Sequence, residues 1–396
     1  MRFVFVVPAL VALVAGCTIT TTNEPAPVDT GTPDAGGTTP EAAAPTPATV
    51  PFQLSNLKLD GVDASKLGDV VVSHANCTFH TETKEVSCID NDLVQYVTVD
   101  QPGAGKIGMY VAKSVRVEPN ARIVPKGTFA LAIVALESFD VQGTIDVSAD
   151  RDYATAGGFV HGTSGDVQGA GPGGGGAGST TNGAGGGGYC GAGGKGAALT
   201  TGGTPAAGGA AYGTPENVPL VGGSTGGAGT LPNSGSGGGA VQLVAGTTFT
   251  LGANGIVAAG GGGGAFVGAA GTQHGSGGGS GGAILIEAPT VTLAGSLLAE
   301  GGAGGAKDFG QNAQLSSTAA ESAALANGSL GGSGSGGGQI DGGDATALAG
   351  DNAPGGGGGA GRIRINSTSG ASTTGAKHLS PNVGSTCLTE GTLAAP

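Results

Sequence analysis

Residues 237–261 read GGGAVQLVAGTTFTLGANGIVAAGG, and residues 281–302 read GGAILIEAPTVTLAGSLLAEGG. Each stretch has an apolar strand pattern, a tight corner, an alternating strand, a second corner at glycine, and a short strand that runs into more glycine. Because these parts follow the same order twice, the two stretches predict one backbone path that is repeated.

Two further stretches carry the same pattern. Residues 131–147, LAIVALESFDVQGTIDV, repeat it in full, and residues 359–366, GAGRIRIN, hold a partial copy. A single copy cannot bury its own apolar face, so stacking of the copies is the expected solution. The sequence therefore predicts an all-β fold, a parallel β-helix-like stack of short rungs, with a body at residues 106–368.

Long glycine-rich tracts interrupt the predicted rungs at residues 157–239, 260–282 and 301–361. The chain has 87 glycines among 396 residues and no tryptophan, so large side chains that could fill a thick core are scarce. Two interpretations of the tracts stay open. They are either flexible low-complexity loops or packed polyglycine II helices, in which only glycine lets neighbouring backbones touch. The second interpretation resembles the polyglycine sandwiches of certain phage adhesins.

The charge of the chain limits its partners. The formal net charge is −13, and 11% of the residues are charged. Nucleic acid is not expected as a partner, because phosphate binding requires clustered Lys and Arg. Lys195 follows two glycines but has no Ser or Thr after it, so no phosphate-binding loop is present. No cofactor is predicted.

The N-terminus has the features of a lipoprotein signal. Arg2 precedes an apolar run at residues 3–14, and the sequence Val-Ala-Gly-Cys ends at Cys17. This resembles the lipobox of bacterial lipoproteins, which implies cleavage before Cys17 and acylation of that cysteine. Several acyl chains on one cysteine anchor a protein stably in a membrane. By the same resemblance, Thr18 after the cysteine implies the outer membrane or cell surface.

The rest of the chain divides by composition. The expected segments are a signal peptide at 1–16, a Thr/Pro/Ala-rich tether at 17–51, a small β region at 52–105, the body at 106–368 and a C-terminal tail at 369–396. The tether is too poor in large apolar residues to bury a core, so it is expected to be extended.

The cysteines of the mature chain suggest disulfides. Cys77 and Cys88 flank a polar turn, which favours a disulfide between them in an oxidising envelope. Free thiols and a metal site with His74 and His80 stay open as alternatives, although strand alternation places Cys77 and the two histidines on opposite faces. Two cysteines remain, Cys190 and Cys387. A bridge between them would leave no odd thiol, but nothing in the sequence sets their distance.

Few residues suggest chemistry. The densest group of charged side chains is Asp146, Asp150, Arg151 and Asp152, which a β-helix lyase or hydrolase could use, but an exposed polar strand edge is the simpler explanation. Asp341, Asp344 and Asp351 form an acidic loop that offers a weak calcium site as an alternative. We therefore predict no catalytic residue and no metal site.

The strings GGGSGGAILIEAP at residues 277–289 and GAGRIRIN at 359–366 resemble those of glycine-rich surface lipoproteins that are common in myxobacteria. That family has no established activity, so no functional residue is transferred from it. The leading expectation is a lipid-anchored, non-enzymatic surface protein with a structural or adhesive role. The membrane is its expected partner through the lipid anchor, and extracellular polysaccharide or other surface proteins are candidates for a further partner. The alternatives are a carbohydrate-active β-helix enzyme and a glycan-binding module that uses exposed Tyr153, Tyr189 and Tyr212.

Overall fold

A computed structural model describes residues 44–151, 153–161, 164–265, 274–348, 352–373 and 375–396. The chain divides into two units, Met1–Ala44 and Pro45–Pro396, and every described strand belongs to the second. The predicted signal peptide, Cys17 and most of the predicted tether lie outside the described residues, as do Asp152 and Asp351.

The described part of the chain is nearly all β. Its helical elements are two single 3₁₀ turns, η1 (Ala64–Lys66) and η2 (Asn91–Leu93). None of the helices in the described residues is long and apolar enough to cross a membrane. The all-β class predicted from the sequence is confirmed.

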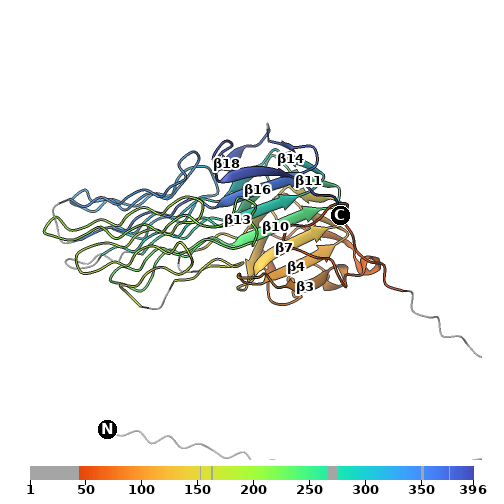
Figure 1. The fold of residues 1–396 in the computed structure, drawn as a ribbon, viewed down its shortest axis with the longest axis horizontal. Coiled ribbons are helices and arrows are strands. Elements are labelled where there is room, and N and C mark those ends of the chain that lie inside the picture. Colours follow the sequence, from red (N-terminus) through yellow and green to blue (C-terminus); the bar gives the residue numbers. More distant parts are fainter. Residues whose placement is uncertain (1–43, 152, 162–163, 266–273, 349–351, 374) are drawn as a thin grey trace, which may run out of the picture. The chain divides into compact units, whose positions relative to one another are not determined.

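The described strands form three sheets (Figure 1). The first sheet has the order β1 (Asp69–Val72), β5 (Ser114–Val117), β8 (Phe139–Val141), β11 (Thr248–Leu251), β14 (Thr290–Leu293) and β17 (Ala371–Ser372). The second has the order β19 (Leu388–Thr392), β16 (Arg362–Ser367), β13 (Ala283–Glu287), β10 (Ala240–Ala245), β7 (Ala130–Ala135), β4 (Ile107–Ala112) and β3 (Gln95–Val99). The third has the order β18 (His378–Ser380), β15 (Ser296–Leu298), β12 (Ile256–Ala258), β9 (Thr144–Asp146), β6 (Arg122–Lys126) and β2 (Cys77–His80).

The chain visits the three sheets in a fixed cycle. From β4 onward it passes through the second, first and third sheets in turn, and each strand pairs in parallel with its equivalent one cycle later. Among the described strand pairs, β3 with β4 is the antiparallel exception. We refer to the three sheets, formed by successive cycles of the chain, as the column.

The repeated sequence pattern sets the register of the column. Ile133 aligns with Leu243 and then with Ile286 in the second sheet. In the first sheet Phe139 aligns with Phe249, which aligns with Val291. Like side chains therefore stack on like, as the repeats predict, and they form an inner core whose members are almost fully buried.

A second apolar core covers the outer face of the second sheet. Strands β4, β7 and β10 are buried at every position. Their outward residues, such as Met109 and Val134, pack with Phe52 and Leu57 from residues 45–63. We call residues 45–63 the strap. The strap explains why these strands are continuous apolar runs, the pattern expected of strands buried on both faces.

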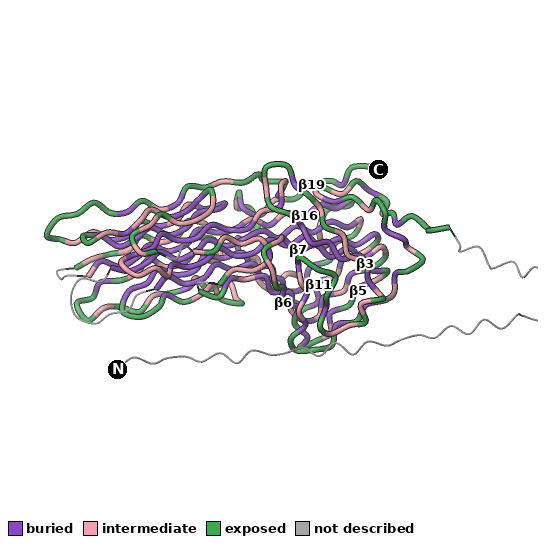
Figure 2. Tube along the Cα trace, turned by 90° about the horizontal axis from the view of Figure 1, so that it is seen from below, coloured by how far each residue is buried: buried purple, intermediate pink, exposed green. Residues whose placement is uncertain are grey.

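The glycine-rich tracts leave the column at one kind of corner. They connect β9 to β10, β12 to β13 and β15 to β16, always from the third sheet to the second. We call residues 147–239, 259–282 and 299–361 the first, second and third arms. Figure 1 shows the arms extending together to one side of the strands, and Figure 2 shows that most of their inner segments are buried.

Hydrogen bonds connect the segments of different arms. Residues 183–188 donate in turn to segments 194–197, 275–278 and 173–176, and then repeat the cycle. Residues 275–281 likewise donate to segments 353–359, 262–265 and 224–227. A period of three residues with three different neighbours is a packed arrangement, which residues 183–188 and 275–281 therefore form with their neighbours.

Parts of three predicted segments take part in long-range pairing. Residues 52–105 do not stand apart, because β1 pairs with β5 and β2 pairs with β6. Residues 369–396 provide β17, β18 and β19, the last strand of each sheet. Residues 45–51, which the prediction included in the tether, belong to the second unit, where Ala48 N donates to Val62 O at 3.0 Å. Local patterns did not show these long-range pairings.

Candidate functional site

The acidic group selected from the sequence does not converge. Asp146 lies on the outer side of β9 and is 5% exposed, and its carboxylate accepts from Arg122 Nη2 at 2.5 Å and from Ser148 N at 2.9 Å. Asp150 instead accepts from the side chain of Asn312 at 2.8 Å. Because the two carboxylates have different partners, they do not form the paired acid and base that glycoside hydrolysis requires.

Tyr153, Tyr189 and Tyr212 do not form one exposed surface. Tyr153 is 73% exposed, but Tyr189 is fully buried, so the predicted exposure of Tyr189 is wrong. The rings of Tyr189 and Tyr212 lie 4.6 Å apart between centroids at the base of the first arm, and Arg362 stands 5.8 Å from the Tyr189 ring. Burial raises the pKa of both phenols. The pair fills space between the arm and the second sheet.

The four described cysteines form two disulfides. Cys77 is bonded to Cys88 and Cys190 to Cys387, with Cα atoms 5.2 Å and 5.6 Å apart. The first disulfide excludes Cys77 and Cys88 as zinc ligands. In the described residues no three His, Cys, Asp or Glu side chains come together as a metal site. The second disulfide joins the first arm to the residue that precedes β19.

Asp341 and Asp344 hydrogen-bond to the main chain of the first arm. Their carboxylates accept from the main-chain amides of Ala192 at 2.8 Å and Lys195 at 2.7 Å. The three-residue spacing of the acceptors matches the three-residue spacing of the donors. Each carboxylate thus takes the place of a main-chain carbonyl at the edge of the packed arms, which is a structural use of both residues.

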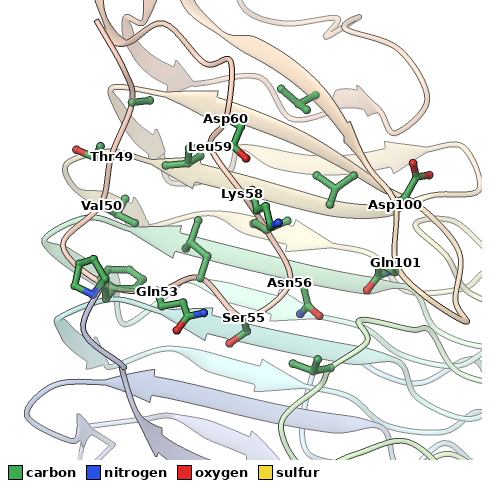
Figure 3. Close-up of a pocket in the computed structure, with 18 of the residues that line it drawn as sticks. Thr49, Val50, Gln53, Ser55, Asn56, Lys58, Leu59, Asp60, Asp100 and Gln101 are labelled. Carbon is green, nitrogen blue, oxygen red and sulfur yellow. The ribbon is translucent and has the colours of Figure 1, made fainter.

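A hollow on the second sheet lies under the strap. It has a volume of about 1160 Å³ and is open to solvent between the two limbs of the strap (Figure 3). Its apolar lining includes Val50 and Leu59, from the two ends of the strap, and Val97 from β3. Its charged lining residues include Lys58 and Asp100. Such a mixed lining can hold a small molecule but does not specify one.

Glu287 holds the tip of the strap. Its side chain is fully buried, and Ser55 Oγ and Asn366 Nδ2 donate to Oε1 at 2.5 Å and 3.0 Å. Gln242 Nε2 and Ser55 N donate to Oε2 at 2.6 Å and 3.4 Å. With both oxygens occupied, this carboxylate positions the strap instead of acting on a substrate.

No polar cluster surrounds Glu287 in the sequence, because its partners are distant along the chain. Ser55 is 232 positions away, and Gln242 and Asn366 come from the preceding and following cycles of the column. The pairing of β10, β13 and β16 brings these three strands side by side. Aligning the repeats could have placed Glu287 beside Gln242 and Asn366, but no pattern indicated Ser55.

Glu300 is a second buried carboxylate, at the start of the third arm. It is 1% exposed, and neither carboxylate oxygen has a hydrogen-bond partner among the described residues. Burial raises its pKa to about 8, and the nearby Ser380 hydroxyl and Gly337 amide only partly offset this. The carboxyl is therefore neutral at pH 7 in the folded protein.

A smaller hollow of about 180 Å³ lies where the three arms meet near the column. It is lined by Arg151, Asn233, Ser234, Gly263, Ala265 and Phe309. The guanidinium carbon of Arg151 stands 4.4 Å from the centre of the Phe309 ring. Arg151 was selected from the sequence for its neighbouring carboxylates, whereas Phe309 was not recognised.

Comparison of the chain with protein-family models, with curated proteins and with solved structures found no match. The functional assignment therefore depends on the geometry described above.

Proposed function

We propose that the column is a parallel β-helix. The proposal is supported by the cyclic path through three sheets and by the parallel register that links each strand to its equivalent in the next cycle. Stacked cycles of this kind bury one continuous core, which a single repeat cannot do.

We further propose that the arms are polyglycine II helices. That conformation has three residues per turn, no internal hydrogen bonds and a fully available backbone. The three-residue cycle of donors in segments 183–188 and 275–281 supports this proposal. A Cβ atom on Gly277 would overlap the carbonyl of Gly185, which agrees with backbones in direct contact.

On this basis we propose a lipid-anchored, non-enzymatic protein of the outer membrane or cell surface with a structural or adhesive role. The carrying observation is that the three arms leave one corner of the column and pack into one hydrogen-bonded block. Such a block presents a fixed surface, because each segment is held by neighbours on several sides. Cys17 supplies the lipid anchor and the following tether separates the body from the membrane.

Binding of the mature chain tests the role. A Cys17→Ser chain without the lipid is expected to bind cells of its source, extracellular polysaccharide or itself. These three interactions are measured by cell pull-down, by polysaccharide co-sedimentation and by analytical ultracentrifugation. A folded chain that is inert in all three would remove the structural or adhesive role.

Acylation tests the anchor separately. Labelled palmitate is expected to join the wild-type chain when it is expressed in a bacterium with lipoprotein-processing enzymes, and not the Cys17→Ser chain. Equal labelling of the two chains, or no labelling of either, would contradict the assignment of Cys17 as the lipidation site.

The enzymatic alternative receives less support. Asp146 is neutralised by Arg122, Asp150 is bonded to Asn312, and Glu287 has both oxygens occupied. The alternative predicts cleavage of a polysaccharide that is lost in an Asp146→Asn variant. Release of reducing or unsaturated ends by the wild type alone would favour it over our proposal.

A further inference from the structure

The turn at Arg151 is constructed from parts of all three arms. Asp150 and Tyr153 exchange main-chain hydrogen bonds of 2.9 Å and 2.8 Å across the turn. The side-chain oxygen of Asn312, from the third arm, accepts from Arg151 N at 3.0 Å and from Gly263 N of the second arm at 2.9 Å. The position of Arg151 is therefore fixed by groups that are distant in sequence.

Arg151 has a backbone conformation that arginine seldom adopts. Its φ is +50°, in the left-handed region that favours glycine or asparagine. Glycine would suit this turn better on backbone grounds alone. Strained residues of this kind gather at ligand sites when the surrounding structure holds them in place, as Asn312 does here.

The guanidinium of Arg151 is unused by the described protein. Of the five described arginines, Arg116 and Arg122 pair with aspartates, and Arg362 and Arg364 donate to a carbonyl and an amide oxygen. The Arg151 side chain has no hydrogen bond or ion pair with a described group, and its guanidinium carbon lies 4.4 Å from the centre of the Phe309 ring. Among the described residues it is thus an oriented cation without a polar partner, in a chain of net charge −13.

Two neighbouring groups complete the hollow. Phe309 is 37% exposed, so part of its ring is available to a ligand. Asn233, whose side-chain amide can both donate and accept hydrogen bonds, is also part of the lining. Sugars are recognised by such a set, because an aromatic ring packs against C–H groups and planar polar side chains bind hydroxyls.

We propose that this hollow binds an acidic saccharide, one uronic-acid unit at a time. The sugar carboxylate accepts two N–H groups from Arg151, since the guanidinium fork matches a carboxylate, and the sugar ring packs on Phe309. At 180 Å³ the hollow is smaller than the roughly 300–1,000 Å³ of pockets for drug-sized ligands, which suits one monosaccharide unit of a longer chain. This inference rests on the proposed surface role and names the partner's chemistry.

Polygalacturonate is the probe, and its methyl ester is the matched control because it has the same sugar backbone without the charge. The Cys17→Ser chain is titrated with each polymer by calorimetry. We expect binding to polygalacturonate and at least tenfold weaker binding to the ester. We expect Arg151→Gly, which relieves the positive φ, to weaken polygalacturonate binding about tenfold, and Phe309→Leu to weaken it several-fold.

Lys307→Gln is the matched variant, since it removes a neighbouring exposed cation outside the hollow. It is expected to change affinity less than twofold. The inference is overturned if the wild type does not bind polygalacturonate, if the ester binds equally, or if Lys307→Gln weakens binding as much as Arg151→Gly.

The two proposals fail in different ways. If wild type and Arg151→Gly bind cells or themselves equally, and neither binds polygalacturonate, the surface role stands and the saccharide site does not. If only the Arg151-dependent binding to polygalacturonate is seen, without attachment to cells, matrix or self, the site stands and the structural or adhesive role does not.

Discussion

In both the column and the arms, the buried main chain needs hydrogen-bond partners. The column combines these bonds with large apolar side chains, whereas the arms are rich in glycine. In the column, parallel ladders bond the main chain and stacked side chains such as Phe139 and Phe249, 5.5 Å apart, fill the interior. In the arms, the main chain bonds to several neighbours and the interior is filled by backbone itself. Apolar burial stabilises the first region, whereas dense hydrogen bonding must offset the large conformational entropy of glycine in the second.

The difference shows that one chain can combine side-chain packing and backbone packing when the change from one to the other occurs at defined positions. The change occurs after the third-sheet strands β9, β12 and β15; after β12, Ala259 leads directly into Gly260, and after β15, Ala299 and Glu300 lead into Gly301. If the comparison is right, removing bulk should damage the column and adding bulk should damage the arms. The following changes test that statement, from the largest expected effect to the smallest.

Phe249→Ala should destabilise the column most. The side chain is fully buried and stacks on Phe139, so truncation leaves a cavity and costs about 3–5 kcal/mol of unfolding free energy. Urea unfolding followed by circular dichroism measures the loss. Val71→Ala, at a position that is 48% exposed in the first sheet, is the control and should cost less than about 1 kcal/mol. Similar losses in both variants would show that the inner core is not the main source of stability.

Removal of the Cys190–Cys387 disulfide should weaken the link between the first arm and the column. The bond joins residues 197 positions apart, so it restricts the unfolded chain strongly, and the double Cys→Ser variant should lose about 2–4 kcal/mol. The Cys77–Cys88 bond spans 11 positions, and its double Cys→Ser variant should lose less. Thermal unfolding of both variants under non-reducing conditions makes the comparison. An equal or reversed ranking would mean that the loop-length argument does not apply here.

Gly277→Ala should destabilise the arms by adding a single methyl group. The new Cβ would overlap the carbonyl of Gly185 in a neighbouring segment, and such overpacking costs about 1–3 kcal/mol. Gly105→Ala is the control, because a Cβ there meets nothing within 4 Å and φ is not left-handed. Hydrogen exchange of the arm amides should increase in the first variant only. Unchanged exchange at Gly277→Ala would contradict direct backbone contact.

The sequence predicted the column better than the arms, and the reason is physical. The apolar residues of residues 131–147, 237–261 and 281–302 repeat in order, so their stacking in register could be expected. The hydrogen-bond cycle of the arms has no such signature, because glycine has no side chain to mark which neighbour it faces. The sequence therefore left both interpretations of the tracts open.

The candidate site could be predicted only in part. The turn between Cys77 and Cys88 is local, so their disulfide was expected. Arg151 was singled out, but Phe309 lies in another arm and no pattern connects the two. Tyr189 was taken as an exposed aromatic residue of an arm, yet packing between the first arm and the column buries it. Contacts between arms depend on their order in the block, which composition does not reveal.

Glu300 tests the boundary between the two regions through pH. Its pKa is raised from the ordinary value of 4.5 to about 8 by burial, so the folded protein keeps this proton while the unfolded chain loses it above about pH 4.5. Because the unfolded state then binds fewer protons, the free energy of unfolding should fall as pH rises from about 4.5 to about 8. Above that range this residue contributes no further change.

Glu300→Gln should remove that dependence, since the amide is neutral at every pH and nearly the same size. Between pH 5 and pH 6 the wild type should lose about 1 kcal/mol more than the variant, because the linkage slope is at most about 1.4 kcal/mol per pH unit. Urea midpoints at the two pH values measure the difference, and Glu321→Gln, at an exposed position of the third arm, is the control that should keep the wild-type slope. A Glu300→Gln chain with that same slope would mean that the carboxylate finds a cation or water partner when it ionises, and the junction of column and arm would then be wetter than its burial indicates.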